Sequence, residues 1–318
     1  MNSIFMYRIF FMLLGSVLTY YVSMKIIEQT AMIDGTFEKN DECLIKLEDN
    51  IGKSLNLTMH ERTLLSSVTT TNKNIKLKDV IGHEELKKEV ESMVLKPLQC
   101  KEFYKECDLL KPPNGIILYG PPGTGKTMIA KAISNEFSGC FINFSINQIE
   151  NKLYGESLKM LKAVFTLADK IKPCVIFIDE IDGIFGKRNI LDQTYVNSLK
   201  TMFLREMDGF IEKDPSILVI GTTNKLNNID DAVLRRMRIQ FYVGLPTDED
   251  IEAMLSKLLY QFPKIDCKKL ANELSGFSGS DIQELCKYSA HKSLIKSTSN
   301  TFEITSDTVL ECIEHFRN

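Results

Sequence analysis

Short apolar segments recur along the chain from Lys76 onward, and longer amphipathic stretches separate them. The segments have the length and composition of buried strands, and they lie at 115–120, 140–146, 174–180, 216–224 and 239–246. Continuous apolar strands that alternate with helix-length segments are typical of a parallel sheet covered by helices. We therefore expect an α/β subdomain over residues 75–246.

The pattern changes after Pro246, where strand-like segments end and apolar residues recur at helical spacing. Thr247 can cap the first of these helices. Ser280, with Gln283 three residues later, has the form of a second helix start. These signals predict a small helical subdomain over residues 247–318.

The N-terminal part carries an uncharged apolar segment at 9–24, bounded by Arg8 and Lys25. A helix of that length reaches ~24 Å, and neighbouring apolar residues bring the segment close to the ~20 residues that a bilayer requires. Two other interpretations are a cleaved signal, which would end in an A-x-A-like site that is absent here, and a buried helix. We expect one transmembrane anchor over 1–27 and a polar linker with some helix over 28–74.

Composition narrows the range of partners. A net charge of −3 and a pI near 5.9 give no basic field, so nucleic acid is not an expected partner. The chain has 8 cysteines and no CxxC pair, which argues against a zinc site or a dithiol redox centre. Unpaired thiols suit a reducing compartment such as the cytosol.

A glycine-rich loop, GPPGTGKT at 120–127, follows the first apolar strand and precedes a helix-like stretch. Its glycines let successive N–H groups and a helix N-terminus point at phosphates, and a lysine reaches the β and γ oxygens. Thr127 can supply a hydroxyl ligand to Mg²⁺. This P-loop predicts a site for ATP and Mg²⁺, with contacts from Pro122, Gly123, Thr124, Gly125, Lys126, Thr127 and Met128.

Polar residues follow two later strands at the edge where ligands of open α/β sheets bind. Asp179 and Glu180 end the strand CVIFI, and Asn224 ends the strand SILVIGTT. We expect Asp179 to hold Mg²⁺ through water, Glu180 to act as general base on the attacking water, and Asn224 to align that water.

Three arginines, Arg235, Arg236 and Arg238, lie in a segment before the last strand. Phosphoryl transfer needs a cation to stabilise developing negative charge, and an arginine finger can contribute ~10³–10⁵ in rate. Because these arginines lie far along the chain from the P-loop, Arg235 and Arg236 are expected to act on the nucleotide of a neighbouring subunit. The alternative is a solvated basic loop.

Taken together, GPPGTGKT, VIFIDE, GTTN, LRR and GFSGSDI resemble the motifs of the AAA ATPases from about Leu77 to the end. KLYGES at 152–157, FIDEID, RRM at 235–237 and the single anchor are similar to one branch, the mitochondrial-sorting-of-proteins translocases. That branch extracts mislocalised tail-anchored proteins from the outer mitochondrial membrane.

The resemblance implies a homo-hexamer whose nucleotides lie between subunits and whose pore threads membrane-protein substrates. It places Val80, Ile81 and Gly82 against adenine and Gly279 and Ser280 near the nucleotide. The segment Asp208, Gly209 and Phe210 would communicate between neighbours. The substrate-gripping pore loop would consist of Lys152, Leu153, Tyr154 and Gly155.

Two departures from the branch are visible. Leu153 replaces a tryptophan, in a chain that has no tryptophan, and Gln240 stands where relatives often carry arginine. The resemblance implies a single-pass protein of the outer mitochondrial membrane, with peroxisomes or the endoplasmic reticulum also possible and the ATPase in the cytosol.

Other classes remain as alternatives. An AAA remodeller of the microtubule-severing or membrane-scission type usually carries a helical recruitment domain in place of an anchor. A membrane AAA protease needs an HExxH zinc site, whereas His83-Glu84 is followed by Lys87 at the position of the second histidine. Intact Lys126 and Glu180 argue against a scaffold with an inactive nucleotide site.

Overall fold

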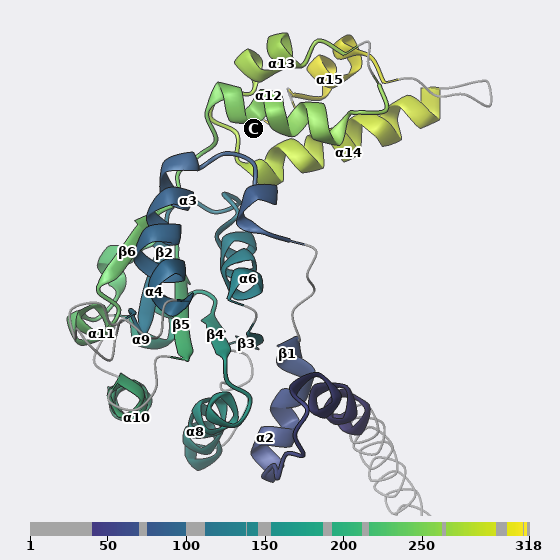
Figure 1. Cartoon of the computed structure of the whole chain (residues 1–318). Coiled ribbons are helices and arrows are strands. Elements are labelled where there is room, and N and C mark those ends of the chain that lie inside the picture. Colours follow the sequence, from purple (N-terminus) through teal and green to yellow (C-terminus); the bar gives the residue numbers. More distant parts are fainter. Residues whose placement is uncertain are drawn as a thin grey trace, which may run out of the picture. The chain divides into compact units, whose positions relative to one another are not determined.

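The chain divides into two compact units, Met1–Ser66 and Ser67–Asn318, in the computed structural model (Figure 1). The predicted anchor and the first two pore-loop residues, Lys152 and Leu153, lie outside the described residues. Within the described part of the chain, every helix is too short or too polar to cross a bilayer. The structure describes residues 40–69, 75–99, 112–137, 139–145, 154–186, 193–211, 216–262, 265–296, 304–313 and 315–316.

The first unit is helical over residues 40–51 and again in α2, Met59–Leu64. Thr58 and Glu61 form a capping box at the start of α2, which satisfies two N–H groups that the helix leaves unpaired. The carboxylate of Glu48 accepts a hydrogen bond from the N–H of Leu55 at 2.6 Å. The segment predicted to be a linker with some helix therefore contains ordered helices.

A six-stranded sheet forms the centre of the second unit, in the order β1-β3-β4-β5-β2-β6. The apolar segments of the sequence form β2 to β6, as predicted. The sheet is mixed, because β1 pairs antiparallel with β3 while the other pairs are parallel. The strands are β1 Val68–Thr69, β2 Gly115–Tyr119, β3 Cys140–Phe144, β4 Cys174–Ile178, β5 Ile217–Thr223 and β6 Ile239–Tyr242.

The prediction of a parallel sheet is therefore wrong at one edge. The sheet also begins before residue 75, where the predicted α/β subdomain started. Val68 and Thr69 pair with Ile142 and Phe141. These two residues are the whole of strand β1, and their neighbours in the sequence are polar. A strand so short has no periodicity that a sequence pattern could reveal.

Helices cover both faces of the sheet (Figure 1). Ile116, Val175 and Leu218 share one buried cluster with Ile129 and Ile133 of α6. Because successive strand residues point to opposite faces, the alternate positions face a second layer. There a Cβ on Gly221 would meet Ile181 of α9 and one on Gly115 would meet Met207 of α10. The covering helices are α3 Glu84–Val90, η3 Glu91–Leu95, α4 Lys96–Gln99, α6 Lys126–Glu136, α8 Tyr154–Lys170, α9 Ile181–Phe185, α10 Gln193–Ile211 and α11 Asp231–Arg236.

A separate core of apolar side chains, including Ile251, Leu255, Leu270 and Ile282, holds four C-terminal helices together. They are α12 Asp248–Leu258, α13 Cys267–Glu273, α14 Gly279–Lys296 and α15 Ser306–Ile313. We call these four helices the lid. The predicted cap is confirmed, because the Thr247 hydroxyl accepts from the N–H of Asp250 at 3.3 Å.

The prediction that Ser280 and Gln283 cap the start of a second lid helix is wrong. Helix α14 begins at Gly279, and the residue before it, Ser278, accepts a hydrogen bond from the N–H of Asp281. Asp281 in turn accepts from the N–H and the hydroxyl of Ser278, at 3.0 and 2.6 Å. Ser278 and Asp281 thus take the positions that the sequence analysis gave to Ser280 and Gln283.

Candidate active site

The glycine-rich loop connects β2 to α6 and has a backbone that other residues would not adopt easily. Gly120 and Gly123 have φ values of 148° and 74°. A Cβ on Gly120 would overlap the carbonyl oxygen of Val243, and one on Gly123 would meet the hydroxyls of Ser278 and Ser280. Glycine therefore lets both the sheet and the lid approach the loop closely.

Lys126, the first residue of α6, lies inside this loop with 9% of its surface exposed. Its ammonium group donates to the carbonyl oxygens of Gly120 at 3.0 Å and Pro121 at 2.6 Å. Burial lowers the pKa of Lys126, and the negative charge of Asp179 opposes that shift. A cation held in this way, beside a helix N-terminus, attracts the oxygens of a polyphosphate.

Two acidic residues follow β4, as predicted. Asp179 and Glu180 are both exposed, and Glu180 has φ 50° and ψ 49°, a left-handed conformation that is unusual for a residue with a side chain. Residues in such conformations gather at functional sites, where the surrounding contacts maintain them.

Two threonines of β5 contact this acidic segment. The Thr222 hydroxyl donates to Asp179 Oδ1, and the Thr223 hydroxyl donates to Asp182 Oδ1 at 2.7 Å. Asn224, which directly follows this strand, was predicted as a site residue, whereas both threonines were missed. Their signal was present, since a pair of hydroxyl residues ends an otherwise apolar strand.

A cavity of about 660 Å³ joins these elements. The predicted nucleotide residues that line it are Val80, Ile81, Pro122, Gly123, Thr124, Gly125, Lys126, Thr127, Met128, Gly279 and Ser280, together with Asp179, Glu180 and Asn224. Gly82 is the exception, because it faces the carboxylate of Asp250 instead, 2.7 Å from where its Cβ would lie. Lining residues that the sequence analysis missed are Asp79, His83, Thr222, Thr223, Met254, Lys257, Leu258 and Gln283.

The lid contributes one wall of the cavity. The N–H of Ser280 donates to the carbonyl oxygen of Gly123 at 3.1 Å, so the start of α14 is bonded directly to the phosphate-binding loop. The ammonium group of Lys257 on α12 donates to the carbonyl of Asp79 at 3.3 Å. The lid is therefore bonded both to the phosphate-binding loop and to the segment before α3, and all three line the cavity.

His83 lies beside the cavity, in a left-handed conformation with φ 57°. Burial lowers the pKa of its imidazole. The charge of Asp250 and a hydrogen bond to the Thr124 backbone oppose this shift, while Lys87 adds to it. His83 thus joins the segment before α3, the phosphate-binding loop and the lid.

The residues that could hold a magnesium ion fit its chemistry. Thr127 and Asp179 line the same cavity as the loop N–H groups and Lys126. Mg²⁺ prefers hard oxygen ligands and is usually bound by one or two protein groups together with substrate phosphates and water. A hydroxyl group and a carboxylate beside a phosphate-binding loop meet that requirement.

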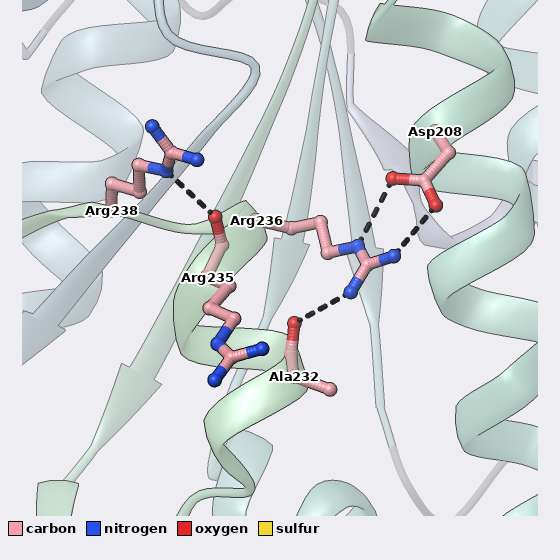
Figure 2. A network of polar contacts seen from close by, with 5 residues as sticks. All are labelled: Asp208, Ala232, Arg235, Arg236 and Arg238. Atoms are coloured by element: carbon pink, nitrogen blue, oxygen red, sulfur yellow. Dashed lines mark hydrogen bonds and ion pairs between the residues drawn. The ribbon is translucent and has the colours of Figure 1, made fainter.

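The three arginines have different surroundings (Figure 2). Arg236 makes two hydrogen bonds to the carboxylate of Asp208 on α10, at 3.0 and 2.8 Å, and a third to the Ala232 carbonyl. Arg238 donates to the carbonyl of Arg235 at 3.0 Å. Within the described residues, the guanidinium group of Arg235 makes no hydrogen bond or ion pair, and it is exposed (Figure 2).

The hydrogen bond from Arg236 lowers the pKa of Asp208, so the carboxylate is charged and paired. Asp208 and Gly209 lie near the end of α10, and Tyr154 and Gly155 open α8.

The comparisons identify the class of protein. The family described as "ATPase family associated with various cellular activities (AAA)" matches residues 116–246. The fold is similar to that of the FIGL-1 AAA domain in complex with ADP, with a TM-score of 0.70 and 27% identity over 82% of this chain and 92% of that one. The structure titled "Structural Basis for Katanin Self-Assembly" has a TM-score of 0.67, also with 27% identity over 82% of this chain and 92% of that one.

The chain therefore belongs to the AAA ATPases, enzymes that bind and hydrolyse ATP. Within them it is similar to proteins named "Outer mitochondrial transmembrane helix translocase". It is 39% identical to that of Danio rerio, over 75% of this chain and 64% of the relative. The human protein is 36% identical, over 82% of this chain and 74% of the relative. The chain thus spans slightly less than two thirds of the Danio rerio relative.

Proposed function

We propose that this ATPase uses Mg²⁺·ATP to pull mislocalised tail-anchored proteins out of the outer mitochondrial membrane. The observation that carries the proposal is the cavity at the end of the sheet, in a chain 36–39% identical to named membrane-helix translocases. Identity to the FIGL-1 and katanin structures is lower, at 27–28%, which favours the translocase over a remodeller of protein assemblies.

The residues of the cavity have the following proposed roles in hydrolysis. Lys126 and the loop N–H groups would bind the β- and γ-phosphates, and Thr127 and Asp179 would hold the magnesium ion. Glu180 accepts a proton from the attacking water, and Asn224 aligns that water. When bound, Mg²⁺ would neutralise charge on the phosphates. Val80 and Ile81 contact the base, Gly82 shapes that segment, and Gly279 and Ser280 close the lid side.

Assembly into a homo-hexamer would place each nucleotide at an interface between subunits. The exposed Arg235 of one subunit is suited to reach the γ-phosphate of the next, because its guanidinium group makes no hydrogen bond or ion pair to any residue that the structure describes. Arg236, held by Asp208, is suited to a supporting role. A head-to-tail interface of this kind closes into a ring.

The proposed division of the chain is a membrane anchor at 1–27, a linker at 28–74, the ATPase subdomain at 75–246 and the lid at 247–318. The anchor would make a single pass through the outer mitochondrial membrane or that of peroxisomes, with the ATPase in the cytosol. The pore loop, Lys152 to Gly155, would grip the substrate through Tyr154, since aromatic contacts do not depend strongly on sequence.

ATP hydrolysis is tested with two substitutions that separate binding from turnover. Lys126→Ala should lose nucleotide affinity, because the phosphate charge is no longer compensated, whereas Glu180→Gln should keep ATP and stop turnover. Nucleotide binding and phosphate release are measured for both variants. Normal turnover by Glu180→Gln would show that another group is the general base.

Membrane extraction needs its own assay. A tail-anchored protein is reconstituted in liposomes with the full chain, and its ATP-dependent release is measured. Tyr154→Ala should hydrolyse ATP and release less substrate, and Glu180→Gln is the inactive control. If the unmodified chain hydrolysed ATP without releasing substrate, the remodeller would become the better proposal.

A further inference from the structure

Thr222 occupies a position from which one side chain reaches both acidic residues of the site. It is buried at the carboxyl end of β5, with 1% of its surface exposed. Its hydroxyl donates to Asp179 Oδ1, and its oxygen accepts a hydrogen bond from the N–H of Glu180 at 3.4 Å. Asp179 and Glu180 are thus both bonded to the neighbouring strand through this hydroxyl.

The register of the sheet explains why the two segments meet. Strands β4 and β5 are parallel, and Ile178 lies opposite Gly221. The next residues are Asp179, which directly follows β4, and Thr222, which is still within β5, so the two lie side by side where β4 ends. Thr223 supports a different group, because its hydroxyl donates to Asp182.

The backbone of Glu180 depends on this support. Its left-handed conformation is unfavourable for a residue with a side chain, and surrounding bonds must maintain it. The N–H of Glu180 is directed at two acceptors, Asp179 Oδ1 at 3.2 Å and the Thr222 hydroxyl. Without the hydroxyl, one acceptor is lost and Asp179 is free to rotate.

We propose that Thr222 is a positioning residue for the ATPase reaction, an inference that rests on the roles proposed above for Asp179 and Glu180. Its hydroxyl fixes the rotation of the Asp179 carboxylate. Both of the hydrogen bonds that this carboxylate accepts go to Oδ1. Oδ2 accepts none among the described residues and would be available to a Mg²⁺-bound water. The same hydroxyl holds the backbone of Glu180, and with it the direction from which the general base approaches the attacking water.

The test compares three variants of the full chain. Thr222→Val removes the hydroxyl and suits a buried strand, because valine is β-branched and similar in size. Thr222→Ser keeps the hydroxyl and loses a methyl group. Thr166→Val is the matched control, since its hydroxyl bonds to the Ala163 carbonyl of its own helix α8 and does not line the cavity.

Two measurements are made on each variant. One is the Mg²⁺ concentration that half-saturates the binding of a fluorescent ADP analogue, with affinity in EDTA as the reference. The other is kcat for ATP at saturating Mg²⁺. Thr222→Val should need about 10- to 100-fold more Mg²⁺ and turn over more slowly by a similar factor, as is typical when the partner of a metal-binding side chain is removed. Thr222→Ser should restore both, and affinity in EDTA should not change.

Two results would overturn the inference: an unchanged Mg²⁺ requirement in Thr222→Val, or an equal change in Thr166→Val. If the Mg²⁺ requirement of Thr222→Val were unchanged and its thermal stability were lower, Thr222 would only support the sheet. The Mg²⁺ titration measures binding and needs no turnover. It therefore still tests the role of Thr222 if the chain binds nucleotide without hydrolysing ATP. A lack of ATP hydrolysis by the unmodified chain would refute the proposed function and not the role of Thr222.

Discussion

Substitution of Arg235 and of Arg236 should separate catalysis from stability, although the two residues are adjacent. Arg236 is bonded to Asp208 and to the Ala232 carbonyl, whereas the guanidinium of Arg235 makes no such bond among the described residues. We expect Arg236→Ala to weaken the fold and Arg235→Ala to leave it unchanged. The effect of Arg235→Ala should appear only in ATP hydrolysis.

The exposure of the ion pair limits its contribution. The side chains of Arg236 and Asp208 are 29% and 50% exposed, so solvent screens the interaction. Exposed pairs contribute ~0.2–1 kcal/mol, and the two-bond geometry places this pair near the upper end. Arg236→Ala should therefore lower the free energy of unfolding by about 1 kcal/mol or less. Arg235→Ala should stay within ~0.5 kcal/mol of the unmodified chain and lose ~10³-fold or more in ATPase rate.

Urea unfolding and phosphate release are the assays, and Asp208→Ala completes a double-mutant cycle with Arg236→Ala. The Arg236 hydrogen bond lowers the pKa of Asp208 from its ordinary 3.8. The coupling energy should thus be fully present above that pH and disappear as the pH falls through the lower, folded value. The reasoning fails if Arg235→Ala destabilises the chain more than Arg236→Ala does. It also fails if Arg235→Ala keeps its ATPase activity.

Three further tests, which use five substitutions, examine the phosphate-binding loop, the start of α14 and His83. Gly123→Ala should cost ~1–3 kcal/mol of stability, because φ is 74° and the new Cβ would meet Ser280. Gly155→Ala is the control, because a Cβ there meets open space, and its free energy of urea unfolding should not fall in this way. Ser278→Ala should lower stability by ~1 kcal/mol through loss of the α14 cap, and Ser280→Ala by less than ~0.5 kcal/mol, in the same assay. Burial lowers the pKa of His83, so the unfolded chain takes up a proton near the ordinary value of 6.5 before the folded one does, and stability falls as the pH drops below it. His83→Gln should weaken that dependence in unfolding measured from pH 8 to pH 5.

The strands that carry the site could be predicted because their environment determines their composition. Strand β4 is buried along its whole length, and so is β5, which gives continuous apolar runs. The polar residues that follow such strands then stand out in the sequence. Asp179 and Glu180 after β4, and Asn224 after β5, were found in this way, and all three line the cavity.

Contacts between distant segments could not be predicted in the same way. The choice between Ser278 and Ser280 as the cap of α14 illustrates this, since each has a suitable residue three positions later. Ser278 is buried against Gly123 and takes the cap, whereas the N–H of Ser280 bonds to the carbonyl of Gly123. The local pattern allows either serine, and packing against the phosphate-binding loop decides between them.

The phosphate-binding loop is therefore bonded on several sides by segments that lie far from it in the chain. The carbonyl of Gly123 accepts a hydrogen bond from the N–H of Ser280 of the lid, and His83, before α3, lines the same cavity as the next residue, Thr124. Gly120 packs against Val243 at the end of β6. Because the N–H of Ser280 bonds directly to this loop, we expect a change in the loop backbone on nucleotide binding to strain the contact with the lid. The lid would then respond to the nucleotide through a bond between distant segments, which a one-dimensional pattern cannot contain.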